Sequence, residues 1–332
     1  MPELKDKKIL FFSPKAFGYE IAIKKRLEKY GASVVYFDDR PSNGFWGKAV
    51  LRAKPELMKV FVERYYKKIF RTLQPKDCFD FIFLLNLEAM PIWFLEKIKS
   101  CNPNAQVVFY MWDSINNKPH AAQYLNYCNR AFSFDPSDEN KGGFQFRPLF
   151  FINEYKEISK NRDYLYDLSF IGTAHSDRLK ITEELGECIK KQGGQIYKFF
   201  YLQSKKLWFY LKLRDPNFRK THINDFAYTP LSVSETVNIV AKSRVVVDIQ
   251  HPKQTGLTMR SIEMIGAERK LITTNNSIKN YDFYSANNIC VIDRNNPVVE
   301  KSFWGTDYEP IAPELYHKYS IDGWIEDLFA LK

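Results

Sequence analysis

Residues 245–274 read VVVDIQHPKQTGLTMRSIEMIGAERKLITT, and this stretch decides the fold of the second half of the chain. Its apolar start predicts a buried strand that ends at about Ile249, and a polar loop containing Gly256 then leads into a helix. We expect that helix to end near Gly266, before a new strand over 270–273. A loop-to-helix junction of this kind suits an anion, because free N–H groups and the positive end of the helix dipole converge there.

Outward from this stretch, strand-like and helix-like patterns alternate along the whole chain. In the first half, strands are predicted over 8–14, 33–37, 79–85, 106–112 and 131–134, and helices over 19–30, 48–73 and 91–99. In the second half, strands are predicted over 168–171, 195–200, 244–249 and 270–273, and helices over 178–192, 232–241 and 258–267. Nearly continuous apolar strands separated by helices indicate parallel sheets covered on both faces, hence an α/β protein with two Rossmann-like domains.

The apolar pattern lapses into a polar stretch just before residue 165, and we expect the domain boundary there. The prediction is an N-terminal domain over 1–150, a linker over 151–164, a second domain over 165–300 and a helical tail over 301–332.

Composition excludes several classes of protein. The 332 residues are 45% hydrophobic and 16% aromatic, which is incompatible with disorder. No apolar run approaches the roughly 18 residues that span a bilayer, and no signal peptide is recognisable. The five cysteines form no CxxC pair, so neither a disulfide framework nor a zinc site is expected, and a cytoplasmic location follows. The net charge of +10 indicates an anionic partner.

Four side chains near the Gly256 loop suit a nucleotide diphosphate. Thr258 and Arg260 supply a hydroxyl and a guanidinium for the phosphates, and the Glu263 carboxylate could accept hydrogen bonds from ribose hydroxyls. His251, between the strand and the loop, could touch the donor phosphate or sugar. The alternative is an ordinary strand-loop-helix with a surface glutamate.

The run GLTMRSIEMIGA over 256–267, followed by the strand LITT, resembles the donor-site signature of GT-B glycosyltransferases. The resemblance is strongest to CgeB-like proteins and to proteins of lipopolysaccharide or capsule biosynthesis. With the FIGT opening at 170–173 it extends over roughly residues 165–295, whereas the first half matches in architecture only. It implies two Rossmann-like domains facing a cleft, with a nucleotide-sugar donor on the second domain and a glycan or lipid-linked acceptor on the first.

The resemblance also implies roles for individual residues. Glu263 resembles the ribose-binding glutamate, Arg178 a diphosphate-binding cation, and the remaining donor positions are Gly172 and Thr173 in the first loop and Gly256, Leu257 and Thr258 in the diphosphate loop. The final helix of the tail would cross back to the first domain. Retaining members with a Glu-x7-Glu pair carry an acid where this chain has Thr255, so the stereochemical outcome stays open.

The family reacts without a bound metal, and we expect neither a metal nor a cofactor here. The five histidines show no H-x-x-x-H spacing, and Asp38 and Asp39 form an isolated pair. Arg260, Arg178 and the helix N-terminus are then the means of stabilising the departing diphosphate.

An inverting transfer needs a general base near the acceptor hydroxyl. Asp113 is the preferred candidate because it ends an apolar strand, where α/β sheets place ligands, and the alternative is a capping role. Glu88, after another strand, and His120, in the following loop, are the other candidates. Lys15 and Tyr19 follow the first strand and are predicted to contact the acceptor.

Positive charge concentrates in two segments in which Lys and Arg are mixed with apolar and aromatic residues. Residues 48–76 contain nine Lys and Arg against Glu56 and Glu63, and aromatic and cationic residues alternate over 197–214. Either segment suits an anionic membrane surface, or is an ordinary helix with one solvated face. The leading hypothesis is therefore a glycosyltransferase at the inner face of the cytoplasmic membrane, in surface polysaccharide synthesis.

Two alternatives remain. A nucleotide-sugar epimerase of the same fold would turn over its substrate without an acceptor. A non-enzymatic nucleic-acid or membrane-surface binder would account for the charge, although no RNA or DNA module is recognisable and no nucleic acid is expected as a partner.

Overall fold

The computed structural model describes residues 4–42, 55–73, 78–140, 142–251 and 256–331. These residues divide into two compact units, which are described separately. Unit 1 comprises residues 1–149 and 321–332, and unit 2 comprises residues 150–320. Part of the basic segment at 48–76 lies outside the described residues.

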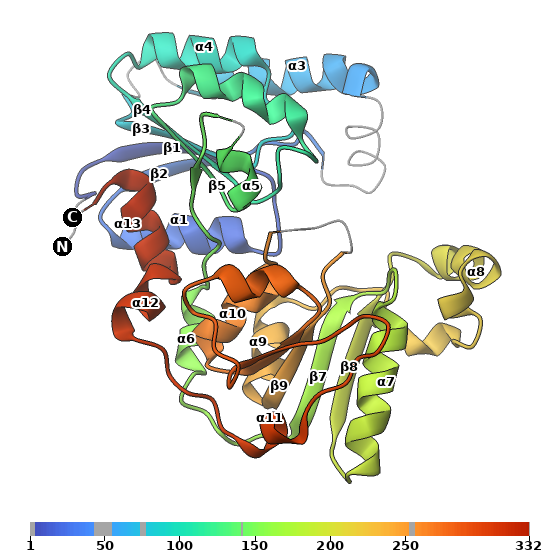
Figure 1. Ribbon diagram of the computed structural model, residues 1–332. Coiled ribbons are helices and arrows are strands. Elements are labelled where there is room, and N and C mark those ends of the chain that lie inside the picture. Colours follow the sequence, from blue (N-terminus) through green and yellow to red (C-terminus); the bar gives the residue numbers. More distant parts are fainter. Residues whose placement is uncertain (1–3, 43–54, 74–77, 141, 252–255, 332) are drawn as a thin grey trace. The chain divides into compact units, whose positions relative to one another are not determined.

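Unit 1 is a parallel α/β unit (Figure 1). Its described strands form a six-stranded sheet in the order β2-β1-β3-β4-β5-β6. The strands are β1 (Lys8–Ser13), β2 (Ser33–Asp38), β3 (Phe81–Leu85), β4 (Gln106–Met111), β5 (Arg130–Ser133) and β6 (Gln145–Phe146). The helices are α1 (Tyr19–Lys29), α3 (Pro55–Thr72), α4 (Ile92–Cys101), the 3-10 helix η1 (Pro119–Tyr127), α5 (Pro136–Glu139) and α13 (Ile321–Phe329).

Both faces of this sheet are covered, which explains why its central strands are apolar at nearly every position. Leu10, Leu84 and Phe109 belong to the core on the face covered by α3, α4 and η1. Phe83 lies on the opposite face, where α13 packs. Trp324 of α13 is fully buried, and its ring centroid lies 4.9 Å from that of Tyr110 and 5.9 Å from that of Phe83.

Unit 2 repeats this architecture with a five-stranded parallel sheet among its described residues, in the order β11-β10-β9-β7-β8. The strands are β7 (Tyr166–Thr173), β8 (Ile196–Tyr201), β9 (Ser243–Asp248), β10 (Lys270–Thr273) and β11 (Ile289–Val291). The α-helices are α6 (Asn153–Glu157), α7 (Arg178–Lys191), α8 (Lys205–Arg214), α9 (Val233–Ala241), α10 (Met259–Ala267), α11 (Lys301–Gly305) and α12 (Pro313–Lys318). The 3-10 helices are η2 (Pro216–Phe218), η3 (Ile223–Asp225) and η4 (Asn276–Asn280). Two Rossmann-like α/β units, the predicted fold class, are thus confirmed.

The division into units assigns the predicted segments as follows. The stretch predicted as a linker contains α6, whose Tyr155 is buried in unit 2. The predicted tail is divided, because residues up to Ser320 belong to unit 2 and α13 belongs to unit 1. The polar residues of 151–164 indicate a break between strands and so predicted a linker. Helix α6 could not be predicted there, because Tyr155 alone does not produce a helical pattern of apolar residues.

The end of α10 agrees with the helix predicted over 258–267. The helix continues to Ala267, and Glu268 adopts the left-handed conformation with φ 51°. Gly266 serves a different purpose: a Cβ atom there would lie 2.4 Å from Cγ of Phe151. The glycine is therefore required by the close approach of α10 to the start of unit 2.

No helix in the described part of the chain is both long and apolar enough to cross a membrane.

We expect Trp324→Ala to lower the free energy of unfolding by about 3–5 kcal/mol, because it leaves a cavity between α13 and the sheet of unit 1. Phe17→Ala is the matched control, since the Phe17 side chain is 80% exposed and its loss should change the value by less than about 0.5 kcal/mol. Urea titration followed by circular dichroism measures both. Equal effects of the two substitutions would contradict the packing role of α13.

Candidate functional site

The sheet of unit 2 reverses its strand order between β7 and β9. From β7 the chain passes to β8 on one side, and it later returns to place β9 on the other side. Open parallel sheets bind ligands beyond the carboxyl ends of the strands at such a point. The predicted donor residues Gly172 and Thr173 end β7, and the others follow β7 or β9, so the structure places them along this edge.

Arg178, the first residue of α7, spans the reversal point. Its Nε donates to the carbonyl oxygen of Ile249 at 2.7 Å, and its Nη1 donates to the carbonyl oxygen of Thr173 at 3.1 Å. Burial lowers the pKa of Arg178, but a guanidinium stays charged at neutral pH. Gly172 lies beneath it, because a Cβ at this position would lie 3.4 Å from Nη1 of Arg178. Arg178 thus fixes a positive charge between the ends of two strands.

The N-terminus of α10 is fastened to the end of β9. The Asp248 carboxylate accepts hydrogen bonds from the hydroxyls of Thr258, at 2.5 Å, and Ser261, at 2.7 Å. Thr258 is also the N-cap of the helix and accepts from the backbone N–H of Ser261. Gly256 and Leu257 are buried just before it, and the Gly256 carbonyl accepts from Asn275 at 3.3 Å. The helix N-terminus therefore has a defined position at this edge.

Glu263 and Arg260 face each other on α10. Nη1 of Arg260 lies 2.7 Å from Oε2 of Glu263 and 3.3 Å from the hydroxyl of Tyr155 on α6. The Glu263 side chain is only 7% exposed. Burial and the nearby Glu263 charge raise the pKa of Tyr155, which keeps its hydroxyl protonated. A ribose would have to share the Glu263 carboxylate with Arg260.

Two histidines and a second arginine complete the edge. The rings of His175 and His251 lie 5.7 Å apart, and burial together with the charge of Arg178 lowers the pKa of His175 to about 4. Arg294 pairs with Asp177 at 2.8 Å and donates to the carbonyl oxygen of Gln250 at 2.5 Å. Sequence reasoning missed Arg294, although its place after the apolar residues 289–292 was a usable signal.

In unit 1, the three predicted base candidates lie around Lys118, a residue that sequence reasoning also missed. Nζ of Lys118 lies 2.8 Å from Oε1 of Glu88, and the other Glu88 oxygen lies 2.7 Å from Nε of Arg40. Both cations are less than a tenth exposed. The Asp113 carboxylate interacts electrostatically with Lys118, and His120 lies two residues after Lys118 in the sequence.

The environment of Glu88 makes it a poor base. Burial alone would raise its pKa, but the hydrogen bond from Arg40 and the charge of Lys118 hold that pKa far below its ordinary range. Both of its oxygens are engaged. Asp113 accepts a hydrogen bond from Asn117 at 2.9 Å with one oxygen, Oδ1. Burial and the charge of Lys118 lower the pKa of His120, which favours its neutral, proton-accepting form.

Asp39 holds the loop that carries Glu88. Its carboxylate accepts from the backbone N–H groups of Glu88, Ala89 and Met90 at 2.6, 2.9 and 3.0 Å, and from the Tyr66 hydroxyl at 2.8 Å. The Asp38–Asp39 pair therefore has a structural use that spacing did not indicate.

The two predicted acceptor residues differ in exposure. Lys15 is exposed in the loop after β1, whereas the Tyr19 side chain is 6% exposed at the start of α1. Among the described residues, no three His, Cys, Asp or Glu side chains are grouped so as to hold a metal ion.

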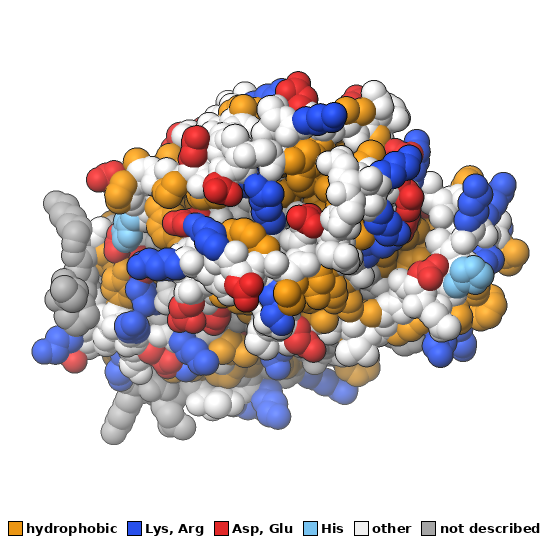
Figure 2. All heavy atoms as spheres, turned by 90° about the horizontal axis from the view of Figure 1, so that it is seen from below, with side chains coloured by type: hydrophobic (Ala, Val, Ile, Leu, Met, Phe, Trp, Pro, Cys, Tyr) orange, Lys and Arg blue, Asp and Glu red, His pale blue; other side chains and the backbone are white. Residues whose placement is uncertain are grey.

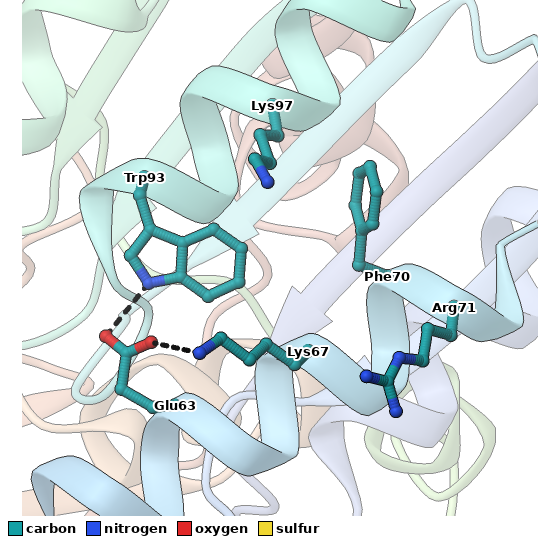
Figure 3. A pocket seen from close by; sticks show the side chains of 6 residues that line it. All are labelled: Glu63, Lys67, Phe70, Arg71, Trp93 and Lys97. Carbon is teal, nitrogen blue, oxygen red and sulfur yellow. Dashed lines mark hydrogen bonds and ion pairs between the residues drawn. The ribbon is translucent and has the colours of Figure 1, made fainter.

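A groove of about 480 Å³ lies elsewhere on unit 1, between α3 and α4 (Figure 3). Nε1 of Trp93 donates to Glu63 at 2.9 Å, and Lys67 points to the same carboxylate. The groove holds none of the predicted site residues and lies between helices rather than at strand ends.

Solved structures with the same fold cover nearly the whole chain. HepE of Anabaena in complex with UDP and glucose covers 98% of this chain and 100% of its own, with 13% identity and a TM-score of 0.56. Sucrose-phosphate synthase of Thermosynechococcus elongatus covers 98% of both chains, with 8% identity and a TM-score of 0.58. A UDP-N-acetylglucosamine 2-epimerase, described as putative, of Listeria monocytogenes covers 98% of both, with 9% identity and a TM-score of 0.54.

No protein-family model matches the sequence, and a search of curated proteins finds no match. The structural similarity shows the fold, and the expected GT-B class of two Rossmann-like domains is confirmed.

We expect Glu88→Gln to destabilise the protein by about 3–5 kcal/mol at pH 7, because Arg40 and Lys118 would be left buried without their counter-charge. The folded-state pKa of Glu88 is lowered, so its contribution is present above the unfolded-state pKa of about 4.3 and is lost as the pH falls below it. The difference between wild type and variant should therefore shrink below about pH 4.

Glu28→Gln is the control, since Glu28 makes an exposed ion pair with Lys24 and its loss should cost less than about 1 kcal/mol. Urea titrations at a series of pH values measure both. A cost of Glu88→Gln that equals the control would refute the assigned role.

Proposed function

We propose that the protein is a glycosyltransferase that moves a sugar from a nucleotide-sugar donor to a glycan or lipid-linked acceptor. The observation that carries the proposal is the Arg178 guanidinium, fixed across the reversal point of unit 2 beside the N-terminus of α10. A nucleoside diphosphate needs positive charge at such a place, and Arg178, Arg294 and the helix dipole supply it.

The similarity to HepE supports a nucleotide-sugar donor, since HepE structures contain UDP or UDP-glucose. In the proposed reaction the bond between the anomeric carbon and the diphosphate oxygen breaks, and the acceptor hydroxyl oxygen bonds to that carbon. The hydroxyl proton passes to a base, and the nucleoside diphosphate leaves as an anion that the two arginines stabilise without a metal.

The acceptor side of the proposal rests on unit 1. Asp113 is the proposed base, with His120 as the second candidate, because Glu88 is already paired through both oxygens. Lys15 is available for contact with an acceptor. We place this activity in surface polysaccharide synthesis, lipopolysaccharide or capsule, in the cytoplasm at the inner face of the membrane, in line with the family that residues 256–267 resemble.

An epimerase is the second candidate, because structures of UDP-N-acetylglucosamine 2-epimerases share the fold. The two activities separate in one experiment: incubation with a nucleotide sugar and no acceptor. An epimerase converts the sugar to its epimer under these conditions, whereas a glycosyltransferase leaves the sugar configuration unchanged.

Arg178→Ala should weaken binding of the preferred nucleoside diphosphate by roughly tenfold or more, because it removes a charge-assisted contact to the phosphates. Arg219→Ala is the matched control, since Arg219 is an exposed arginine of the same unit. Calorimetry with UDP, GDP, ADP, dTDP and CMP, with and without Mg²⁺, measures affinity. Unchanged binding in Arg178→Ala would refute the donor site.

Asp113→Asn should lower the turnover number by about 100-fold while leaving donor affinity unchanged, because a base acts on the acceptor and not on the donor. Release of nucleoside diphosphate in the presence of acceptor, measured across pH 5–9, is the readout. If His120 is the base instead, His120→Gln will abolish turnover. The pH–rate profile of Asp113→Asn will then still show turnover falling at acidic pH, below the ordinary histidine pKa of about 6.5.

A further inference from the structure

Helix α8 of unit 2 is apolar on both of its sides. Leu207, Trp208 and Leu211 pack inward on the core of the unit. On the outer side, Phe209, Tyr210 and Leu213 are 59%, 57% and 81% exposed. A helix on the surface of a globular unit ordinarily buries one stripe and exposes a polar face, so these three side chains form an unusually exposed apolar surface.

The element that carries this surface is firmly built. Ser204 caps α8, and the indole nitrogen of the buried Trp208 donates to the Thr221 hydroxyl at 3.1 Å. The ring of Phe218 in η2 stacks on that of Phe226 at 5.5 Å. The exposed side chains are therefore presented by a rigid scaffold and cannot turn inward without displacing this core.

The segment that carries these apolar side chains is rich in cations. From Lys205 to Lys220 the chain contains six Lys and Arg residues and a single acid, Asp215, which caps the backbone N–H of Asn217. In Figure 2, Lys and Arg side chains (blue) lie among hydrophobic ones (orange) at the right-hand end, where Figure 1 places α8. The surface combines protruding apolar groups with a net positive charge.

We propose that α8 and the adjoining η2 dock unit 2 on an anionic lipid surface. Phe209, Tyr210 and Leu213 would enter the boundary between headgroups and acyl chains, and the cations would contact lipid phosphates. Protruding apolar side chains on a segment rich in Lys and Arg are complementary to such an interface.

Charge and shape favour lipid over other occupants. A second copy of the chain in an isologous dimer would place this positive surface against itself, which costs electrostatic energy. A nucleic acid would use the aromatic rings for stacking but would gain nothing from Leu213, the most exposed of the three. The proposal extends beyond sugar transfer, and it stands or falls independently of nucleotide binding.

One hydrogen bond connects the proposed lipid-binding element with the predicted donor site. Nδ2 of Asn217 in η2 donates to the carbonyl oxygen of Ser176 at 3.3 Å, and Ser176 lies in the loop between Thr173 and Arg178. The lipid-facing element thus touches the first donor loop directly, which suits an enzyme whose acceptor is membrane-linked.

The test is sedimentation of the full chain with vesicles of phosphatidylcholine alone and with a quarter phosphatidylglycerol. We expect binding only to the anionic vesicles, and weaker binding as salt is raised. The double substitution Phe209→Ser and Leu213→Ser should weaken binding by roughly tenfold. Lys206→Ser with Arg214→Ser should weaken it by a similar factor and reduce its salt dependence.

Leu165→Ser is the matched control, because Leu165 is 54% exposed outside α8, and it should bind vesicles as the wild type does. Circular dichroism melting and nucleotide calorimetry confirm that each variant is folded. Vesicle binding that survives both double substitutions would overturn the proposal. So would a dimer that dissociates on Phe209→Ser and Leu213→Ser, or tight oligonucleotide binding with no affinity for vesicles.

Discussion

Buried carboxylates organise the edge of each sheet at which the candidate site residues lie. Asp248 ends β9 and holds the N-terminus of α10 through two hydroxyls, and Asp39 follows β2 and holds the 88–90 loop through three backbone N–H groups. A carboxylate is removed from water only at a high free-energy cost, so it persists there only when donors surround it. Each one therefore specifies a single arrangement of its loop. The positions of Arg260, Glu263 and Glu88 follow from these two anchors.

The strands and the central helix of the candidate donor site could be predicted because their signals are local. Buried parallel strands are continuous apolar runs, and β10 occurs at the predicted residues. The start of α10 was marked by Thr258, a residue type that caps helices. The part of this edge that residues 245–274 form could likewise be predicted, because its strand and helix are close together in the sequence.

The partners of the site residues could not be predicted, because tertiary packing brings them together. Lys118 and Arg40 converge on Glu88 from segments that are far apart in sequence, and neither stands in a recognisable pattern. Tyr155 contacts Arg260 across more than a hundred residues of chain. Asp113, Glu88 and His120 are candidates because of their places after strands, yet the pKa values of Glu88 and His120 depend on burial and on the charge of Lys118. Spacing located the candidates, and only the fold distinguishes a paired carboxylate from an available one.

The place of α13 has a consequence for how the chain is made. Trp324 fills a gap against Tyr110 and Phe83, but it is synthesised only after the whole of unit 2. During translation the sheet of unit 1 therefore leaves the ribosome with one apolar face partly uncovered, and unit 2 can fold as a complete segment while it waits. Such exposed surface in a nascent chain invites aggregation or chaperone binding. The exposure of this face ends only when α13 has been synthesised and packs against the sheet.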